Sequence, residues 1–313
     1  MVVTTSRFGI SSMPEKIHPR QLEPYSVHFN TSAKQWVTTM VRPERNEFTN
    51  ICFQKFISVN FSSEREAKLF AKANSPPKMH PKTNACQICS VSFHGKNLSS
   101  SCRNCGACIC SKCSTRWGIP MFPKTYVSQK SLTARVCKTC DWLSNAFCIA
   151  LLQGNRLQDV KLLYKSRNLN LRACFANIHQ EAMYPVHCAV MGGNLQLLRW
   201  LVETHGCPIF VKNDSMTGSK QSLRTTGSKS LIDLAMTGKP KLDILHYLVI
   251  THNMSVEDTT NPRMALRSLD ALLREKDIDK EKLQVSNEEP ALIEDCASEV
   301  STDTIEDAVS VTS

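Results

Sequence analysis

The segment CRNCGACICSKC, residues 102–113, places five cysteines within twelve positions. It holds the C-x-x-C pairs Cys102/Cys105 and Cys110/Cys113, and two further pairs stand at Cys86/Cys89 and Cys137/Cys140. Two residues between the thiolates let both sulfurs of a pair reach one ion at about 2.3 Å. Eight soft ligands therefore predict two tetrahedral Zn²⁺ sites that are structural, because neither keeps an open coordination position. Iron–sulfur ligation and disulfide pairing are the alternatives.

The spacing of the pairs indicates which of them share an ion. Only four residues separate Cys105 from Cys110, so the second and third pairs would need an immediate chain reversal to serve one ion. We therefore expect an interleaved arrangement: a first zinc on Cys86, Cys89, Cys110 and Cys113, and a second on Cys102, Cys105, Cys137 and Cys140. Cys108 is left over as a small buried or half-exposed thiol. An exchange of roles between Cys108 and Cys110 stays open, because Cys105 and Cys108 also stand at pair spacing.

The composition of the chain bounds its class. It has 313 residues, of which 42% are hydrophobic and 15 are cysteine, so there is room for about two domains. An odd cysteine count, repeated C-x-x-C pairs and no recognisable export signal favour metal ligation over a disulfide framework. No window approaches the roughly 18 consecutive apolar residues that a membrane span needs. We expect a soluble, cytoplasmic protein.

Charge is distributed unevenly along the chain. The net charge is +10, yet residues 277–313 hold 11 acidic residues against two lysines. Residues 83–140 contain eight Lys or Arg and no Asp or Glu. Two Zn²⁺ and eight thiolates together carry −4, which leaves this block at about +4 when it is folded. Such a block predicts an anionic partner: a phospholipid headgroup, a nucleic acid or an acidic protein.

Pattern and composition divide the chain into five segments. Residues 1–80 read as a mostly disordered basic arm, with a short strand at 51–61 and a short helix at 63–74. Residues 81–143 are the double-zinc module, residues 144–260 a helical repeat array, residues 261–276 a capping helix, and residues 277–313 a disordered acidic tail. The fold class that we expect is a small α+β cross-brace zinc module followed by an all-α repeat array, with disordered termini.

The cysteine framework resembles that of the FYVE zinc finger. The likeness extends over about residues 84–142 and rests on CRNCG (102–106), CSKCS (110–114) and ARVCKTC (134–140). Domains of this family bind phosphatidylinositol 3-phosphate on endosomal membranes, and basic and histidine residues around the second cysteine pair grip the phosphate. The resemblance therefore implies a peripheral association with endosomal membranes.

The lipid-binding part of the family pattern is incomplete in this chain. The family's basic-basic-His-His run before the third cysteine reads Leu98–Ser101 here, and its Trp-x-x-Asp element is absent from KMHPKTNAC (78–86). Arg103 and Arg135 match the pattern, and Lys96 adds a third positive charge. Arginines hold phosphate by bidentate charged hydrogen bonds. Three interpretations stay open: specific binding of the 3-phosphate, general binding to anionic membranes, and arginines that only offset the negative zinc–thiolate centres.

A helical repeat follows the zinc module. The stretches 147–164, 186–202 and 232–249 each place a Gly three or four residues after an Ala, followed by an apolar pair. This cadence predicts pairs of short antiparallel helices with Gly154, Gly193 and Gly238 at the turns. The second stretch, YPVHCAVMGGN, resembles the ankyrin consensus Thr-Pro-Leu-His-x-Ala, and the other two are degenerate. The resemblance implies a protein-binding array in which His187 bonds backbone groups at a turn. An unrelated helical bundle is the alternative.

No enzyme motif accompanies these segments. The chain lacks the phosphate-binding loop, the dinucleotide fingerprint, the G-x-S-x-G elbow and the H-E-x-x-H zinc motif. We expect a non-enzymatic adaptor whose finger docks on an anionic membrane, with Phe93 and Leu98 at the bilayer interface, and whose repeats bind a protein. A RING-like ubiquitin-ligase module is one alternative. A nucleic-acid-binding zinc protein is another, less favoured because no helix carries a basic face.

Overall fold

The structure is a computed structural model of the chain. It describes residues 16–21, 25–45, 52–94, 98–118, 121–122, 133–165, 168–178, 181–211 and 221–287. Residues up to Leu269 belong to one unit, and the chain from Asp270 onward to a second. Among the helices of the described ranges, none combines the length and hydropathy that a membrane span requires.

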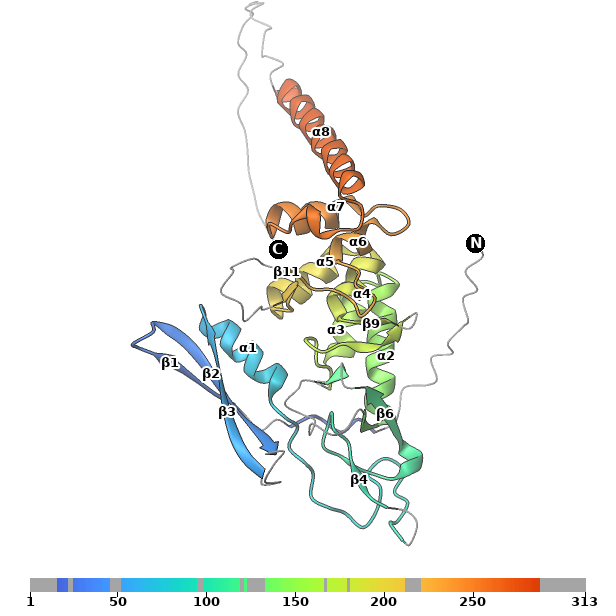
Figure 1. Cartoon of the computed structure of the whole chain (residues 1–313). Coiled ribbons are helices and arrows are strands. Elements are labelled where there is room, and N and C mark those ends of the chain that lie inside the picture. The colour runs from blue at the N-terminus through green and yellow to red at the C-terminus, as the bar shows by residue number, and fades with distance from the viewer. Residues whose placement is uncertain are drawn as a thin grey trace, which may run out of the picture. The chain divides into compact units, whose positions relative to one another are not determined.

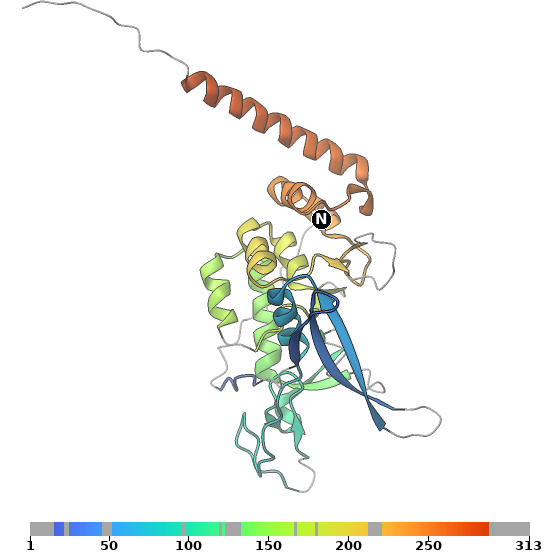
Figure 2. The same cartoon turned by 90° about the vertical axis from the view of Figure 1, so that its left-hand side faces the viewer.

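A three-stranded antiparallel sheet precedes the cysteines (Figures 1 and 2). Its strands are β1 (Ser26–Asn30), β2 (Gln35–Arg45) and β3 (Cys52–Phe61), with β2 in the middle. Helix α1 (Glu64–Asn74) packs on this sheet through the buried Ala67 and Ala71, and the Thr38 hydroxyl donates to the Ala67 carbonyl at 3.1 Å. The Ser63 side chain caps α1 by accepting from the Glu66 N–H.

The prediction of a mostly disordered arm over residues 1–80 is therefore wrong for residues 26–45 and 52–74, which the structure describes as strands, turns and a helix. The expected strand and helix both exist, as β3 and α1. The sequence offered no evident partner for the strand at 51–61. In the structure this strand, β3, pairs with β2 from Trp36↔Phe61 to Arg45↔Cys52. Pairing of this kind is a long-range contact that local propensity does not reveal.

The zinc segment contains short paired strands around a small core. Strand β4 (Ser100–Ser101) pairs with β5 (Cys108–Ile109), and β6 (Ser114–Gly118) pairs with β7 (Thr133–Cys137). A 3₁₀ turn, η1 (Ser111–Cys113), joins β5 to β6. Apart from the cysteines and Ala107, the buried apolar side chains are those of Ile109, Trp117, Phe122 and Val136. Such a core is too small to fold without additional cross-links.

Three helix pairs follow. They are α2 (Lys138–Leu152) with α3 (Leu157–Tyr164), α4 (Pro185–Gly192) with α5 (Leu195–Arg199), and α6 (Leu231–Met236) with α7 (Leu242–His246). The first helices stack, α2 on α4 and α4 on α6 (Figure 1). Gly154, Gly193 and Gly238 have left-handed φ values of 62°, 74° and 71° at the turns, as predicted.

Small hairpins and short turns connect the helix pairs. Strand β8 (Phe175–Ile178) pairs with β9 (Glu181–Met183), and β10 (Phe210–Val211) pairs with β11 (Gln221–Ser222). A 3₁₀ turn, η6 (Val256–Asp258), precedes the last helix.

The second and third pairs repeat each other in detail beyond the predicted pattern. Helices α5 and α7 both continue into a five-residue π-helical segment, η4 (Trp200–Thr204) and η5 (Tyr247–Thr251). A histidine follows each segment and stacks edge-on to its first aromatic ring. The ring centroids are 4.5 Å apart for Trp200 and His205, and 4.6 Å apart for Tyr247 and His252. Two copies of one unit therefore stand side by side, as a repeat requires.

One hydrophobic core runs through the helix pairs and reaches the start of α8 (Pro262–Asn287). The Asn261 side chain accepts from the Met264 N–H at 3.2 Å, and Ala265 and Leu269 join the core. The helix expected at 262–275 continues to Asn287, so the disordered tail predicted from residue 277 is wrong as far as 287. Residues 288–313 lie outside the described residues.

Candidate metal centres and the adjoining arginines

The eight paired cysteines gather in two groups of four, and these are the groups that the pair spacing predicts. The sulfurs within each group lie within 4.8 Å of one another; the groups are Cys86, Cys89, Cys110 and Cys113, and Cys102, Cys105, Cys137 and Cys140. Measured sulfur–sulfur distances are 3.7 Å for Cys89–Cys110, 4.0 Å for Cys102–Cys140 and 3.9 Å for Cys105–Cys137. Four sulfurs at about 2.3 Å from a central zinc form a tetrahedron with edges of about 3.8 Å. Both groups fit a zinc ion.

The sulfurs of the second group accept hydrogen bonds from backbone N–H groups and lie close to one another. The Cys102 sulfur accepts from the N–H of Cys105 at 3.5 Å and of Cys137 at 3.2 Å, and the Cys137 sulfur accepts from the N–H of Cys140 at 3.3 Å. Hydrogen bonds with Cys102, Cys105 and Cys137, followed by burial, raise the pKa of Cys140 well above its usual value. Four thiolates cannot share this site unless a cation neutralises part of their charge, and a divalent metal does so.

The two groups differ in their exposure. All four cysteines of the second group are buried, whereas in the first group Cys89 is exposed and Cys113 is half-buried. The leftover Cys108 is 3% exposed, belongs to neither group, and binds the Gln87 side-chain oxygen through its own N–H at 2.7 Å. Cys110 therefore stands in the cluster and Cys108 beside it.

Asn168 and the N-terminal residues 16–21 surround the second group, and the sequence did not point to them. Asn168 is 1% exposed; its Nδ2 donates to the His18 carbonyl at 2.7 Å and lies 3.9 Å from the Cys140 sulfur. Its Oδ1 accepts from the Arg20 N–H at 2.8 Å, across 148 positions of sequence. Burial lowers the pKa of Arg20 to about 10, against the attraction of the cluster thiols, Cys140 first. No local pattern signals such a contact.

Of the candidate lipid residues, Arg135 lies in strand β7 and Arg103 lies beside it. Arg135 stands directly opposite Arg116, and its guanidinium donates to the Ser100 hydroxyl at 3.1 Å. Arg103 is exposed, and its N–H donates to the Arg135 carbonyl at 2.9 Å. Lys96 lies outside the described residues. The strand pairing adds Arg116 to these basic residues, although the sequence analysis did not single it out. The available signal was the alternation of an exposed Arg116 with a buried Trp117, which is typical of a strand.

Large apolar side chains protrude from the described part of the finger. Leu98 is 73% exposed and Val91 is 50% exposed. Phe93, which we expected beside Leu98 at a bilayer interface, is half-buried and packs against the core of the finger. Among the described residues of 81–143, Leu98 and Val91 are thus the large apolar side chains that face outward.

Two closed, interleaved groups of four cysteines define a structural zinc-binding module. The family model of the FYVE zinc finger matches residues 78–145, and the two clusters fit the two zinc ions of such a finger. The FYVE finger is a binding module without enzymatic activity. The match covers about a fifth of the chain and ends within α2, the first helix of the first pair. Comparison with curated proteins and with solved structures finds no match.

Proposed function

We propose that this protein is a non-enzymatic adaptor whose FYVE finger docks on membranes that contain phosphatidylinositol 3-phosphate. The opposed pair of Arg116 and Arg135 carries the proposal. Like charges directly opposite on neighbouring strands destabilise a sheet, and no Asp or Glu occurs between residues 83 and 140 to relieve them. An anion on this face of the hairpin relieves the repulsion.

Each part of the finger has a role in this docking. The zinc ions link the strands, so that the arginines are held before the ligand arrives. The bond from Arg135 to Ser100 and the bond from Arg103 to the Arg135 carbonyl orient the two residues that match the family pattern. A phosphomonoester is bound by bidentate guanidinium contacts. Leu98 and Val91 enter the interfacial layer of the bilayer, where exposed apolar side chains gain free energy.

The helix pairs form the partner-binding half of the adaptor and follow the ankyrin plan. His187 supports this assignment, because the Tyr184 N–H donates to its Nδ1 at 3.1 Å and its Nε2–H donates to the Leu223 carbonyl at 3.2 Å. The left-handed turn glycines and the matching η4 and η5 segments support it too. The protein then works in the cytoplasm as a peripheral component of endosomal membranes. The RING-like and nucleic-acid-binding alternatives gain no support from the described residues.

Vesicle binding tests the proposal. The zinc-loaded full chain is sedimented with vesicles that contain phosphatidylinositol 3-phosphate, and with vesicles brought to the same surface charge by phosphatidylserine. Retention on the first and weak retention on the second is the expected result. Arg103→Gln/Arg135→Gln abolishes retention, whereas Arg156→Gln/Arg263→Gln, which removes the same charge outside the finger, does not.

Two outcomes would contradict this function. Equal retention on both kinds of vesicle would show general attraction to anionic surfaces, without recognition of the phosphoinositide. Unchanged retention of Arg103→Gln/Arg135→Gln would show that these arginines only offset the charge of the zinc–thiolate centres. Retention of the protein on duplex DNA at physiological salt would favour the nucleic-acid alternative.

A further inference from the structure

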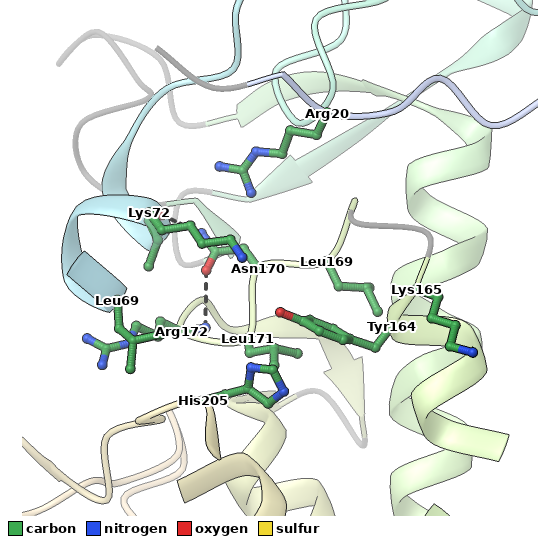
Figure 3. Close-up of a pocket in the computed structure, with 11 residues that line it drawn as sticks. Arg20, Leu69, Lys72, Tyr164, Lys165, Leu169, Asn170, Leu171, Arg172 and His205 are labelled. Atoms are coloured by element: carbon green, nitrogen blue, oxygen red, sulfur yellow. Dashed lines mark hydrogen bonds between the residues drawn. The ribbon is translucent and has the colours of Figure 1, made fainter. Parts of the chain in front are cut away.

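A basic cavity lies between α1, the chain that follows α3, and the end of η4 (Figure 3). Its volume is about 810 Å³, within the range of small-molecule sites. None of the described residues that line it is Asp or Glu; its polar lining includes Arg20, Lys72, Tyr164, Asn170, Arg172 and His205. Figure 3 shows the ends of Arg20, Lys72 and Tyr164 directed toward a common space, while Lys165 points away from it.

Arg172 lines the cavity and contributes a buried positive charge to its wall. Its guanidinium donates through one terminal nitrogen to the Gly206 carbonyl. Its Nε is buried, and within the described part of the chain that atom has no hydrogen-bond partner. A buried N–H without an acceptor is costly, and burial accordingly lowers the pKa of Arg172 below its ordinary value.

The pKa of His205, another lining residue, is lowered by burial and by positive charges near the cavity. Burial and then the charges of Lys72, Arg65 and Lys161 lower its pKa to about 4. The ring is therefore neutral at pH 7, where it accepts or donates a hydrogen bond without adding charge. Three lysine and arginine side chains act on it together, so the surroundings of the cavity are positive.

The cavity is separate from the arginine face of the finger. Neither Arg103 nor Arg135 lines it. The charge of Arg20 is partly balanced by the thiols of the second zinc group, which attract it. The charge of Arg172 is likewise partly balanced, by Cys207 and Glu66. Lys72 makes no ion pair with any described residue, so its positive charge remains available.

We propose that this cavity binds a small, soluble polyphosphate ester. Lys72 and Arg20 hold the phosphate oxygens by charged hydrogen bonds, and the Tyr164 hydroxyl adds a neutral one. Arg172 adds the attraction of its charge from the wall of the cavity. Leu69, Leu169 and Leu171 form an apolar wall for the organic part of the ligand. The site is independent of the membrane docking proposed above.

Calorimetric titration of the zinc-loaded full chain with inorganic tripolyphosphate tests the site. We expect saturable binding that an equal ionic strength of sodium chloride does not abolish. Lys72→Glu weakens it about tenfold or more, since each tenfold corresponds to about 1.4 kcal/mol, of the order of one charged hydrogen bond. Lys68→Glu, one turn earlier on the same exposed face of α1, is the matched control and leaves binding unchanged.

The finger variant separates the two anion sites. Arg103→Gln/Arg135→Gln loses vesicle retention and keeps tripolyphosphate binding, if the cavity is the site. The inference is overturned if no saturable binding occurs, if Lys72→Glu binds as tightly as Lys68→Glu, or if only the finger variant loses tripolyphosphate. In that last case the finger binds the polyphosphate, and the proposed membrane function is untouched.

Discussion

Replacement of single cysteines is the most direct test of which cysteines bind zinc. Cys110→Ser removes one of four sulfurs from the first group, whereas Cys108→Ser makes the same chemical change two residues away and outside both groups. Both variants replace one sulfur atom by one oxygen atom. Any difference in zinc content therefore reports coordination and not the loss of a thiol as such.

The structure sets the expected size of each effect. A structural zinc contributes about 10–16 kcal/mol of apparent binding free energy, which exceeds the total stability of many domains, about 5–15 kcal/mol. The finger core contains few apolar side chains besides its cysteines, so loss of an ion unfolds the part that the ion holds. Cys108→Ser places a hydroxyl where the thiol is 3% exposed, at a cost of about 1–3 kcal/mol without loss of metal.

Native mass spectrometry of the full chain counts the bound zinc ions. We expect two ions in the wild type and in Cys108→Ser, and one in Cys110→Ser. One ion remains because the second group is fully buried and shares no sulfur with the first. Equal zinc loss in both variants, or loss in Cys108→Ser alone, would refute the ligand assignment.

Two further predictions concern buried side chains outside the zinc ligands, Asn168 and His187. Asn168→Ala leaves the His18 carbonyl and the Arg20 N–H without their partner. We expect it to destabilise the protein by about 2–4 kcal/mol. Limited proteolysis should then cleave residues 16–21 faster, and an unchanged cleavage rate would argue against the contact. Burial lowers the pKa of His187 from 6.5 to about 4, so its contribution to stability is complete above pH 6.5 and is lost as the pH falls toward 4. The loss is about 2 kcal/mol at pH 5 and about 3 kcal/mol near pH 4. Intrinsic-rate-corrected hydrogen exchange of the α4 amides at pH 7 and pH 5 measures the first of these values; protection that does not fall would contradict the buried, neutral ring.

The local features of this protein were predictable from its sequence. The two zinc groups follow from C-x-x-C spacing and a four-residue gap, because a metal ion enforces the same geometry wherever those spacings occur. The turn glycines and the hydrogen bond from the Tyr184 N–H to His187 follow from a repeat of a few residues. Each is a short-range constraint, in which the residues that interact are close in the sequence or held by one ion.

Tertiary structure alone decided the remaining features. The β1–β3 sheet depends on pairing between strands whose patterns are individually weak. Asn168 meets Arg20 across 148 positions, Arg116 meets Arg135 through a hairpin register, and Lys72, Arg172 and His205 converge on a cavity from three separate segments. These contacts exist only after the chain has folded, because their energy comes from burial and charge shared between distant residues, and no local sequence pattern carries that information.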